Sequence, residues 1–359
     1  MVFLAPKKNL FNLYFLRYKF IFLTIGLLFV YILLNGDIRS NINVRKCFSD
    51  INVQNKIEDI LLSERKPRKG KTIFFHETSC NIPDTLNHVR LKARQACAIE
   101  SAALTNPNLD IYVLFASPKI LNNQTITPIL ESILSYPNVY LRNVNLWSYA
   151  ADTPIYEWFK DGKLFKSKYI YSHVSDFLRY LTLWHWGGTY LDLDVVMMKT
   201  IENIPPNFAG AESIYHVAAG VLNFDWDGFG HEIADMCLRN FQTHFDGYDW
   251  GKNGPGVITR TLHEICKTKQ IYLMTRSRCF NFNVFQNETF YAVPYTHWKY
   301  FFDSDYLERT LEMTKNSIAI HVWNRYSSDT PIIVGSNVAY GVIAEKFCPK
   351  VYKSSGKYF

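Results

Sequence analysis

The stretch Gly187-Gly-Thr-Tyr-Leu-Asp-Leu-Asp-Val-Val-Met-Met198 places two acidic residues in an apolar segment that follows a glycine pair. Residues 177–186 (FLRYLTLWHW) precede it, and their apolar side chains on every face predict a buried helix. Glycine readily adopts the positive φ of a helix C-terminus, so the glycine pair is predicted to end this helix. Residues 189–193 are then predicted to form a short strand with Asp192 and Asp194 at its end. In an extended chain these two carboxylates point to the same face.

The segments before this stretch alternate between strand and helix patterns. Residues 71–75 and 139–143 are candidate strands, and residues 89–104 are a candidate helix. Residues 111–115 (IYVLF) form an unbroken apolar run, which is typical of a strand buried on both faces. The alternation predicts an α/β fold with a mostly parallel sheet flanked by helices. Ligands bind such sheets beyond the carboxyl ends of the strands, where the acidic pair is expected.

The composition is that of a folded protein with a sizeable core, since 48% of the 359 residues are hydrophobic and 16% are aromatic. The formal net charge of +7 is concentrated in two short clusters in the N-terminal part of the chain. These clusters are Lys7, Lys8, Arg17 and Lys19, and Arg65, Lys66, Arg68, Lys69 and Lys71. The rest of the chain is close to neutral and has no recognisable nucleic-acid-binding motif, so nucleic acid is not expected as a partner.

An uncharged apolar run, FIFLTIGLLFVYILL, occupies residues 20–34. It is short for a membrane span, although the flanking basic residues can lengthen it by snorkelling. A cleaved signal peptide is the alternative, and the lack of a small-residue cleavage pattern after the run disfavours it. We expect a single-pass type II membrane protein with a cytoplasmic tail (residues 1–17), a signal-anchor helix (18–36), a stem (37–70) and a lumenal body (71–359).

The seven cysteines all follow the predicted anchor, in agreement with a lumenal and oxidising compartment. None of them lies in a Cys-x-x-Cys pair, so a zinc site is not expected. An odd number leaves one cysteine unpaired. Cys47, in the predicted stem, is the residue we expect to be free.

The two carboxylates at the strand end suit a hard divalent cation such as Mn²⁺ or Mg²⁺. Such a cation can neutralise a diphosphate and make it a good leaving group. A solvated turn is the ordinary alternative, but the apolar flanks, the glycine pair and the predicted anchor favour a metal site. Phosphatases of the haloacid dehalogenase type have a similar strand. In them the motif normally opens the domain, whereas here a long part of the body precedes it.

Several stretches together resemble the glycosyltransferases with a DxD motif. The closest resemblance is to the family of lactosylceramide 4-alpha-galactosyltransferases and α-1,4-N-acetylglucosaminyltransferases. The central match is Ser175-Asp-Phe-Leu-Arg179 followed by residues 187–194. Further matches are Phe74-Phe-His-Glu-Thr-Ser79, Cys97-Ala-Ile-Glu-Ser-Ala-Ala103, Trp250-Gly-Lys-Asn-Gly-Pro255, Ala319-Ile-His-Val-Trp-Asn324 and Phe347-Cys-Pro349. They occur in the family's order and cover about residues 72–350.

The resemblance implies that residues 71–359 form a catalytic domain of the GT-A type. It implies a UDP-sugar donor, UDP-galactose or UDP-N-acetylgalactosamine, and Mn²⁺ (or Mg²⁺) as cofactor. Asp192 and Asp194 would be the catalytic pair and, together with His321, the metal ligands, with the donor ribose as the alternative partner of Asp192. The residues expected to bind the UDP-sugar are Phe75, Asp176, Arg179, Gly188, Tyr190, Trp250 and Gly254.

Three of these assignments have simpler structural alternatives. Arg179 can pair with Asp176, because residues three apart share one face of a helix. His321 can be a buried core histidine whose polar atoms are satisfied. Trp250 can provide ordinary packing instead of a face on which a sugar ring stacks.

The resemblance also implies that transfer retains the anomeric configuration. A double displacement needs a carboxylate opposite the leaving group. Glu212, Asp225 and Asp227 are candidates that the sequence does not separate. Front-face substitution, in which the departing phosphate helps to deprotonate the acceptor hydroxyl, needs no such residue and is favoured. Ala219 stands where the family pattern has asparagine, which leaves the donor-sugar preference open.

We therefore expect a Golgi α-1,4-glycosyltransferase that moves galactose or N-acetylgalactosamine to a galactose-terminated glycolipid acceptor, lactosylceramide-like. An α-1,4-N-acetylglucosaminyltransferase acting on glycoproteins is one alternative. A catalytically silent relative that binds sugar is another, although a silent copy has no need to keep a charged metal site buried. The membrane is an expected partner, and a homodimer or a complex with another transferase is left open.

Overall fold

The computed structural model describes residues 47–49, 54–80 and 88–359. The predicted tail and signal anchor, residues 1–36, lie outside these described residues. In the described part of the chain, no helix combines the length and the hydropathy needed to cross a membrane. Residues Phe48–Phe359 belong to one compact unit.

The compact unit begins before residue 71, where the sequence predicted the end of the stem. Ile57 and Ile60 are buried, and their backbone N–H groups donate to the carbonyls of Lys119 and Asn143 at 2.9 Å each. The described part of the predicted stem therefore packs against the body. Isolated apolar residues in a polar segment have no periodicity, which is why the sequence pattern did not reveal this packing.

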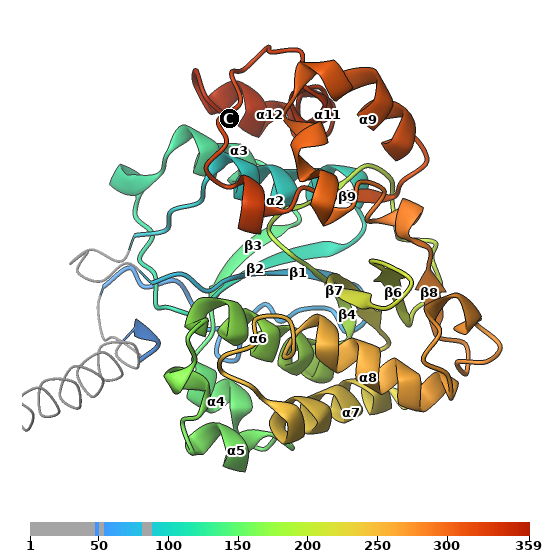
Figure 1. Ribbon diagram of the computed structural model, residues 1–359. Coiled ribbons are helices and arrows are strands. Elements are labelled where there is room, and N and C mark those ends of the chain that lie inside the picture. The colour runs from blue at the N-terminus through green and yellow to red at the C-terminus, as the bar shows by residue number, and fades with distance from the viewer. Residues whose placement is uncertain (1–46, 50–53, 81–87) are drawn as a thin grey trace, which may run out of the picture. The chain divides into compact units, whose positions relative to one another are not determined.

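A central sheet of seven strands is formed by the described residues, in the order β3-β2-β1-β4-β7-β6-β8 (Figure 1). Its strands are β1 (Thr72–Glu77), β2 (Asp110–Phe115), β3 (Val139–Asn143), β4 (Gly188–Leu191), β6 (Phe208–Ala211), β7 (Val217–Phe224) and β8 (Asn283–Phe285). A separate pair consists of β5 (Val195–Met197) and β9 (Ala319–His321). Every residue of β1 and β2 is buried, and for β2 the unbroken apolar run predicted this burial.

The predicted α/β fold with a mostly parallel sheet is confirmed. Strands β1 to β4 pair in parallel, and β6 pairs in parallel with β8. Strand β7 runs antiparallel between β4 and β6. The carboxyl ends of β1, β4 and β6 therefore lie at one edge of the sheet, where β7 begins.

The helices lie on both faces of the sheet (Figure 1). One group comprises α2 (Ala93–Thr105), α3 (Pro128–Leu134), α9 (Leu307–Thr314), α11 (Ala339–Phe347) and α12 (Pro349–Ser354). The other comprises α4 (Leu146–Ala150), α5 (Tyr156–Lys160), α6 (Ile170–Trp186), α7 (Gly228–His244) and α8 (Pro255–Cys266). The short helix α10 (Asn324–Ser327) follows β9 directly.

The C-terminal segment is tied to α2 by a disulfide and by a buried carboxylate. Cys97 of α2 is bonded to Cys348, which immediately precedes α12. The carboxylate of Glu100 accepts hydrogen bonds from the backbone N–H groups of Lys350 and Val351 at 3.0 and 2.7 Å. Glu100 thereby satisfies two of the N–H groups that the first turn of α12 leaves free.

The prediction that Cys47 is the unpaired cysteine is wrong, because Cys47 takes part in a disulfide bond. The free residue is Cys237, which is buried in α7 and contacts the hydroxyl of Thr261 at 3.7 Å. A free cysteine commonly behaves as a small buried hydrophobic residue.

Two buried disulfides provide a matched test of how the C-terminal segment is held. The Cys97–Cys348 bond closes a sequence separation of 251 residues, and the Cys266–Cys279 bond one of 13. Loop-closure entropy predicts that removing the first pair lowers the unfolding free energy by about 2–3 kcal/mol more than removing the second. Urea unfolding of the two double alanine variants measures this difference. Equal losses would show that the long-range bond does not stabilise the protein through chain entropy.

Candidate metal and nucleotide-sugar site

The glycine pair turns the chain from α6 into β4. Gly187 and Gly188 have φ values of 59° and 84°, as predicted for the end of a helix. A Cβ atom on Gly187 would lie 2.5 Å from the backbone of Trp226, and one on Gly188 would lie 2.4 Å from the carbonyl oxygen of Thr72. Both glycines are thus required by close packing. Gly188 lies at the opposite end of β4 from the acidic pair, and the structure does not bring it to the carboxylates.

The two carboxylates converge through a tight turn and not through the alternation of an extended strand. β4 ends at Leu191, and the backbone N–H of Asp192 donates to the carbonyl of Gly220 at 2.9 Å. The carbonyl of Asp192 then accepts a hydrogen bond from the N–H of Val195 at 3.0 Å. This turn places Asp192 and Asp194 outside β4, so the predicted strand over residues 189–193 extends two residues past the observed end.

His321 reaches the acidic pair from the C-terminal part of the chain. β9 pairs with β5 so that His321 lies opposite Val195. The Nε2 atom of His321 is 3.4 Å from Oδ1 of Asp194 and 3.7 Å from Oδ2 of Asp192. One ligand atom from each of the three residues lies within 4.8 Å of the others. The three residues predicted as metal ligands are therefore brought together.

Gly220 of β7 lies against Asp192 and His321 of this cluster. A Cβ atom at this position would lie 2.9 Å from Oδ2 of Asp192 and 3.1 Å from the ring of His321. Any side chain would therefore displace at least one of the two. The requirement comes from close approach and not from backbone conformation, because Gly220 is not among the residues with positive φ.

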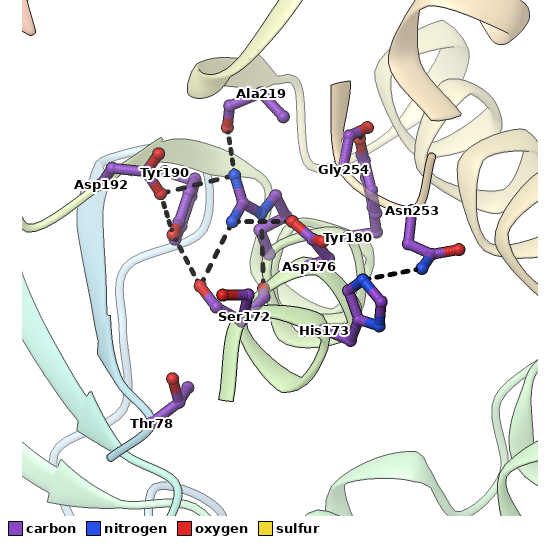
Figure 2. Close-up of polar contacts among 12 residues, drawn as sticks. Thr78, Ser172, His173, Asp176, Tyr180, Tyr190, Asp192, Ala219, Asn253 and Gly254 are labelled. Atoms are coloured by element: carbon purple, nitrogen blue, oxygen red, sulfur yellow. Dashed lines mark hydrogen bonds and ion pairs between the residues drawn. The ribbon is translucent and has the colours of Figure 1, made fainter. Parts of the chain in front are cut away.

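Arg179 links two carboxylates and a backbone carbonyl, and it is almost fully buried. Its Nη2 lies 3.0 Å from Oδ1 of Asp176, and its Nη1 lies 3.4 Å from Oδ1 of Asp192 (Figure 2). Nη1 also donates to the backbone carbonyl of Ala219 at 2.8 Å. The expected pair with Asp176 exists, and the same guanidinium supports the acidic pair. Arg179 thus reaches the cluster as a support for Asp192.

Tyr190 is buried and orients the same oxygen of Asp192. Its hydroxyl donates to Oδ1 of Asp192 at 2.5 Å and lies 3.1 Å from the hydroxyl of Ser175. The guanidinium of Arg179 lies 4.7 Å from the centre of its ring. Asp192 is therefore held through Oδ1, while Oδ2 faces His321. The sequence pattern alone does not reveal that Ser175 contacts the hydroxyl of Tyr190.

The electrostatic environment shifts the pKa values of the three carboxylates differently. Burial raises the pKa of Asp192, but Arg179, His321 and Tyr190 outweigh it and lower the pKa to about 2. Burial raises the pKa of Asp176 to about 7, although Arg179 acts against this shift. Burial also raises the pKa of Asp194. Asp192 is consequently ionised at any physiological pH.

His321 is shifted in the direction that favours the imidazolium. Burial lowers its pKa, but the neighbouring carboxylates of Asp194, Asp192 and Glu212 outweigh burial, and the net shift is upward. A proton on Nε2 takes the place that a cation would occupy between the imidazole and the two carboxylates. Proton and metal therefore compete for one position.

The remaining predicted donor-binding residues are placed differently. A Cβ atom on Gly254 would lie 2.3 Å from Oδ1 of Asp176, so Gly254 packs directly on that carboxylate (Figure 2). Trp250 is 38% exposed, and its face is covered by the guanidinium of Arg325 at 3.9 Å. Phe75 is fully buried in the hydrophobic core.

Two residues that the sequence analysis did not assign border the cluster. The backbone N–H of Asn324 donates to Oδ2 of Asp194 at 2.8 Å, and its side-chain Oδ1 is buried without a hydrogen-bond partner among the described residues. The buried hydroxyl of Tyr291 also lacks a partner there, and its ring centre lies 5.6 Å from that of His321. Only the folded structure shows that Asn324 and Tyr291 border the site.

The two carboxylates and the imidazole of the cluster are a donor set that fits Mn²⁺.

We predict that Mn²⁺ binding strengthens with rising pH because the ion displaces the proton of His321. Below the raised pKa of this residue, the apparent affinity should fall about tenfold per pH unit. Calorimetric titration of Mn²⁺ between about pH 6 and 8, where histidine titrates, measures the slope. His321→Gln should bind more weakly and show a flatter slope. The same slope in this variant would assign the released proton to another group.

We also predict that Gly220→Ala weakens Mn²⁺ binding without changing any ligand. The added methyl group would push Asp192 or His321 away, and supporting residues of metal sites typically change affinity by about 10–100-fold. Mn²⁺ titration of the variant measures this loss, and its thermal unfolding shows whether the fold is retained. Unchanged affinity in a folded variant would show that the cluster can shift to accommodate the methyl group.

Two family models match this chain. The glycosyltransferase sugar-binding region containing a DXD motif matches residues 92–209, and the alpha 1,4-glycosyltransferase conserved region matches residues 227–355. The site is built from both regions, because Asp192 and Asp194 lie in the first and His321 in the second.

Named relatives are similar over most of the chain. Lactosylceramide 4-alpha-galactosyltransferase of Rattus norvegicus is 30% identical over 290 residues, which are 80% of this chain and 76% of the relative. Alpha-1,4-N-acetylglucosaminyltransferase of Homo sapiens is 26% identical over 263 residues, 72% of this chain and 75% of the relative. Among solved structures, the apo-form glycosyltransferase GlyE of Streptococcus pneumoniae TIGR4 is 12% identical, with 80% of this chain and 60% of that chain covered and a TM-score of 0.41. By its family matches and its relatives, this chain belongs to the α-1,4-glycosyltransferase family with a DXD sugar-binding region.

Proposed function

We propose that this protein is a retaining α-1,4-glycosyltransferase that transfers galactose or N-acetylgalactosamine from UDP to a galactose-terminated glycolipid. The observation that carries the proposal is the convergence of Asp192, Asp194 and His321 at the carboxyl edge of a mostly parallel sheet. Relatives named for lactosylceramide support a glycolipid acceptor. The apolar run at residues 20–34 supports a Golgi type II membrane protein with a lumenal catalytic domain.

The cluster offers one free oxygen from each carboxylate. Oδ1 of Asp192 is engaged by Arg179 and Tyr190, which leaves Oδ2 toward His321. Oδ2 of Asp194 accepts the N–H of Asn324, which leaves Oδ1 toward His321. A Mn²⁺ or Mg²⁺ ion held by these atoms would neutralise the diphosphate of the donor and make it a better leaving group. The surrounding residues hold the ligands in place before the donor binds.

Transfer breaks the bond between the anomeric carbon and the diphosphate oxygen, and the electron pair leaves with UDP. In front-face substitution the acceptor hydroxyl oxygen bonds to the same face of that carbon. The hydroxyl proton passes to an oxygen of the departing phosphate. This route requires no protein nucleophile, so the protein contributes by positioning the two substrates and by stabilising charge.

We predict that the full-length protein in detergent releases UDP from one UDP-sugar in the presence of Mn²⁺ and a lactosyl lipid. Galactose, N-acetylgalactosamine and N-acetylglucosamine donors are compared, and EDTA should abolish the reaction. Asp194→Asn should lower kcat/KM by more than the roughly 10–100-fold typical of groups that only support metal ligands. Asp235→Asn is the matched control, because Asp235 forms an i,i+4 ion pair with Arg239 on the surface of α7.

Turnover that survives EDTA and Asp194→Asn would contradict the metal-dependent mechanism. Turnover with UDP-N-acetylglucosamine alone would replace the proposed donors with that of the human relative. A folded protein that binds UDP with Mn²⁺ but transfers no sugar to any galactoside would favour the silent relative.

A further inference from the structure

A further carboxylate, Glu212, lies at the same edge of the sheet as the metal-ligand cluster. Asp192 follows the end of β4 and Glu212 follows the end of β6, and these two strands run in the same direction. The backbone N–H of Asp192 donates to Gly220, and that of Glu212 donates to His216, at 2.9 Å each. Both acceptors belong to the segment in which β7 begins. Glu212 is therefore two strands from Asp192, on the side away from β1.

The other two candidate carboxylates lie at the opposite edge. β7 ends at Phe224, which pairs with Gly188 at the start of β4. Asp225 and Asp227 follow this end, and the backbone of Trp226 between them lies against Gly187. Since Asp192 follows the far end of β4, neither residue can reach it. The structure thereby separates Glu212 from the two carboxylates that the sequence left equivalent to it.

Glu212 and His321 influence each other's pKa electrostatically. Burial raises the pKa of Glu212, whereas His321 and His216 act against this shift. Glu212 also contributes to the raised pKa values of His321 and Tyr291. Among the described residues, Glu212 makes no side-chain hydrogen bond or ion pair. A partly buried carboxylate without a partner has hydrogen-bonding capacity left for a ligand, and so does the buried, unpartnered hydroxyl of Tyr291.

The two oxygens of Asp192 divide the site into two sides. Oδ1 faces Arg179, Tyr190 and, through Arg179, the carboxylate of Asp176. Oδ2 faces His321. Glu212 follows β6, which lies on the far side of β7 from β4, and the charge of His321 acts to lower its pKa. The residues expected to bind the donor sugar, Asp176 and Arg179 above all, occupy the other side.

We propose that Glu212 binds the acceptor, and that its carboxylate accepts a hydrogen bond from the galactose hydroxyl that receives the transferred sugar. The proposal rests on the proposed glycosyltransferase function and names the group that recognises its second substrate. Sugar hydroxyls donate readily to carboxylates, and such charge-assisted hydrogen bonds are stronger than neutral ones. In the transfer step the hydroxyl proton still passes to the departing phosphate. Glu212 is thus a positioning group that aims the hydroxyl oxygen at the anomeric carbon.

The test compares wild type, Glu212→Gln and the matched control Asp227→Asn in the full-length protein. Steady-state kinetics with a soluble β-galactoside and the active UDP-sugar give the acceptor KM and kcat. A 4-deoxy-galactoside, which lacks the reacting hydroxyl, serves as an inhibitor and gives Ki. Mn²⁺-dependent UDP binding, measured by calorimetry, reports the state of the donor side and of the fold.

We expect Glu212→Gln to raise the acceptor KM by about tenfold, because the amide oxygen still accepts the hydrogen bond but lacks the charge that makes it about twice as strong. kcat should change much less, and Mn²⁺-dependent UDP binding should be retained. The Ki of the deoxy analogue should be the same in Glu212→Gln and wild type, because the analogue lacks the hydroxyl that Glu212 binds. Asp227→Asn should match wild type throughout.

Three results would overturn the inference. A large loss of kcat at unchanged KM would place Glu212 on the donor sugar, and a loss of UDP binding would place it in the metal site. Unchanged KM and kcat in an active, folded variant would remove it from the site altogether. Wild type that turns over no donor with any galactoside would instead contradict the proposed function, and the inference would fall with it.

Discussion

The buried guanidinium of Arg179 is the interaction on which the site depends. It lies between the carboxylates of Asp176 and Asp192; Arg179 and Asp176 are buried, and the side chain of Asp192 is 26% exposed. Burying a carboxylate without a counter-charge would cost several kcal/mol and would favour its protonated form. Because Arg179 supplies that counter-charge, Asp192 stays ionised with a pKa of about 2. Asp176 receives less compensation, and its pKa rises to about 7.

Helix α6, which carries Asp176 and Arg179, is also hydrogen-bonded to the loop over residues 250–254. Tyr180 donates to the carbonyl of Gly254 at 2.7 Å, and the ring of His173 lies 3.0 Å from the side-chain amide of Asn253 (Figure 2). The indole N–H of Trp250 reaches the hydroxyl of Ser172 at 3.3 Å. One helix therefore holds both Arg179 and the loop over residues 250–254. A shift of α6 would therefore move Arg179 and this loop together.

Much of the fold could be predicted from local patterns. Buried parallel strands need continuous apolar runs, and the run at residues 111–115 became part of β2. The end of α6 followed from its glycine pair, since positive φ is a local requirement. The start of α6 was missed by seven residues, because Ile170 to Asp176 mix polar and apolar side chains. The packing of Ile57 and Ile60 was missed as well, because single buried residues leave no period in the sequence.

The sequence by itself determined the chemistry of the site. An acidic pair after an apolar strand implies a hard cation, and the resemblance supplied His321 and Arg179 as further members. Only the tertiary structure decided the geometry: the turn after β4, the pairing of β9 with β5, and the position of Glu212 at the same edge of the sheet as Asp192. It also left Phe75 in the core. The physical reason is that residue type is local, whereas distances between side chains far apart in the chain are set by strand pairing and packing.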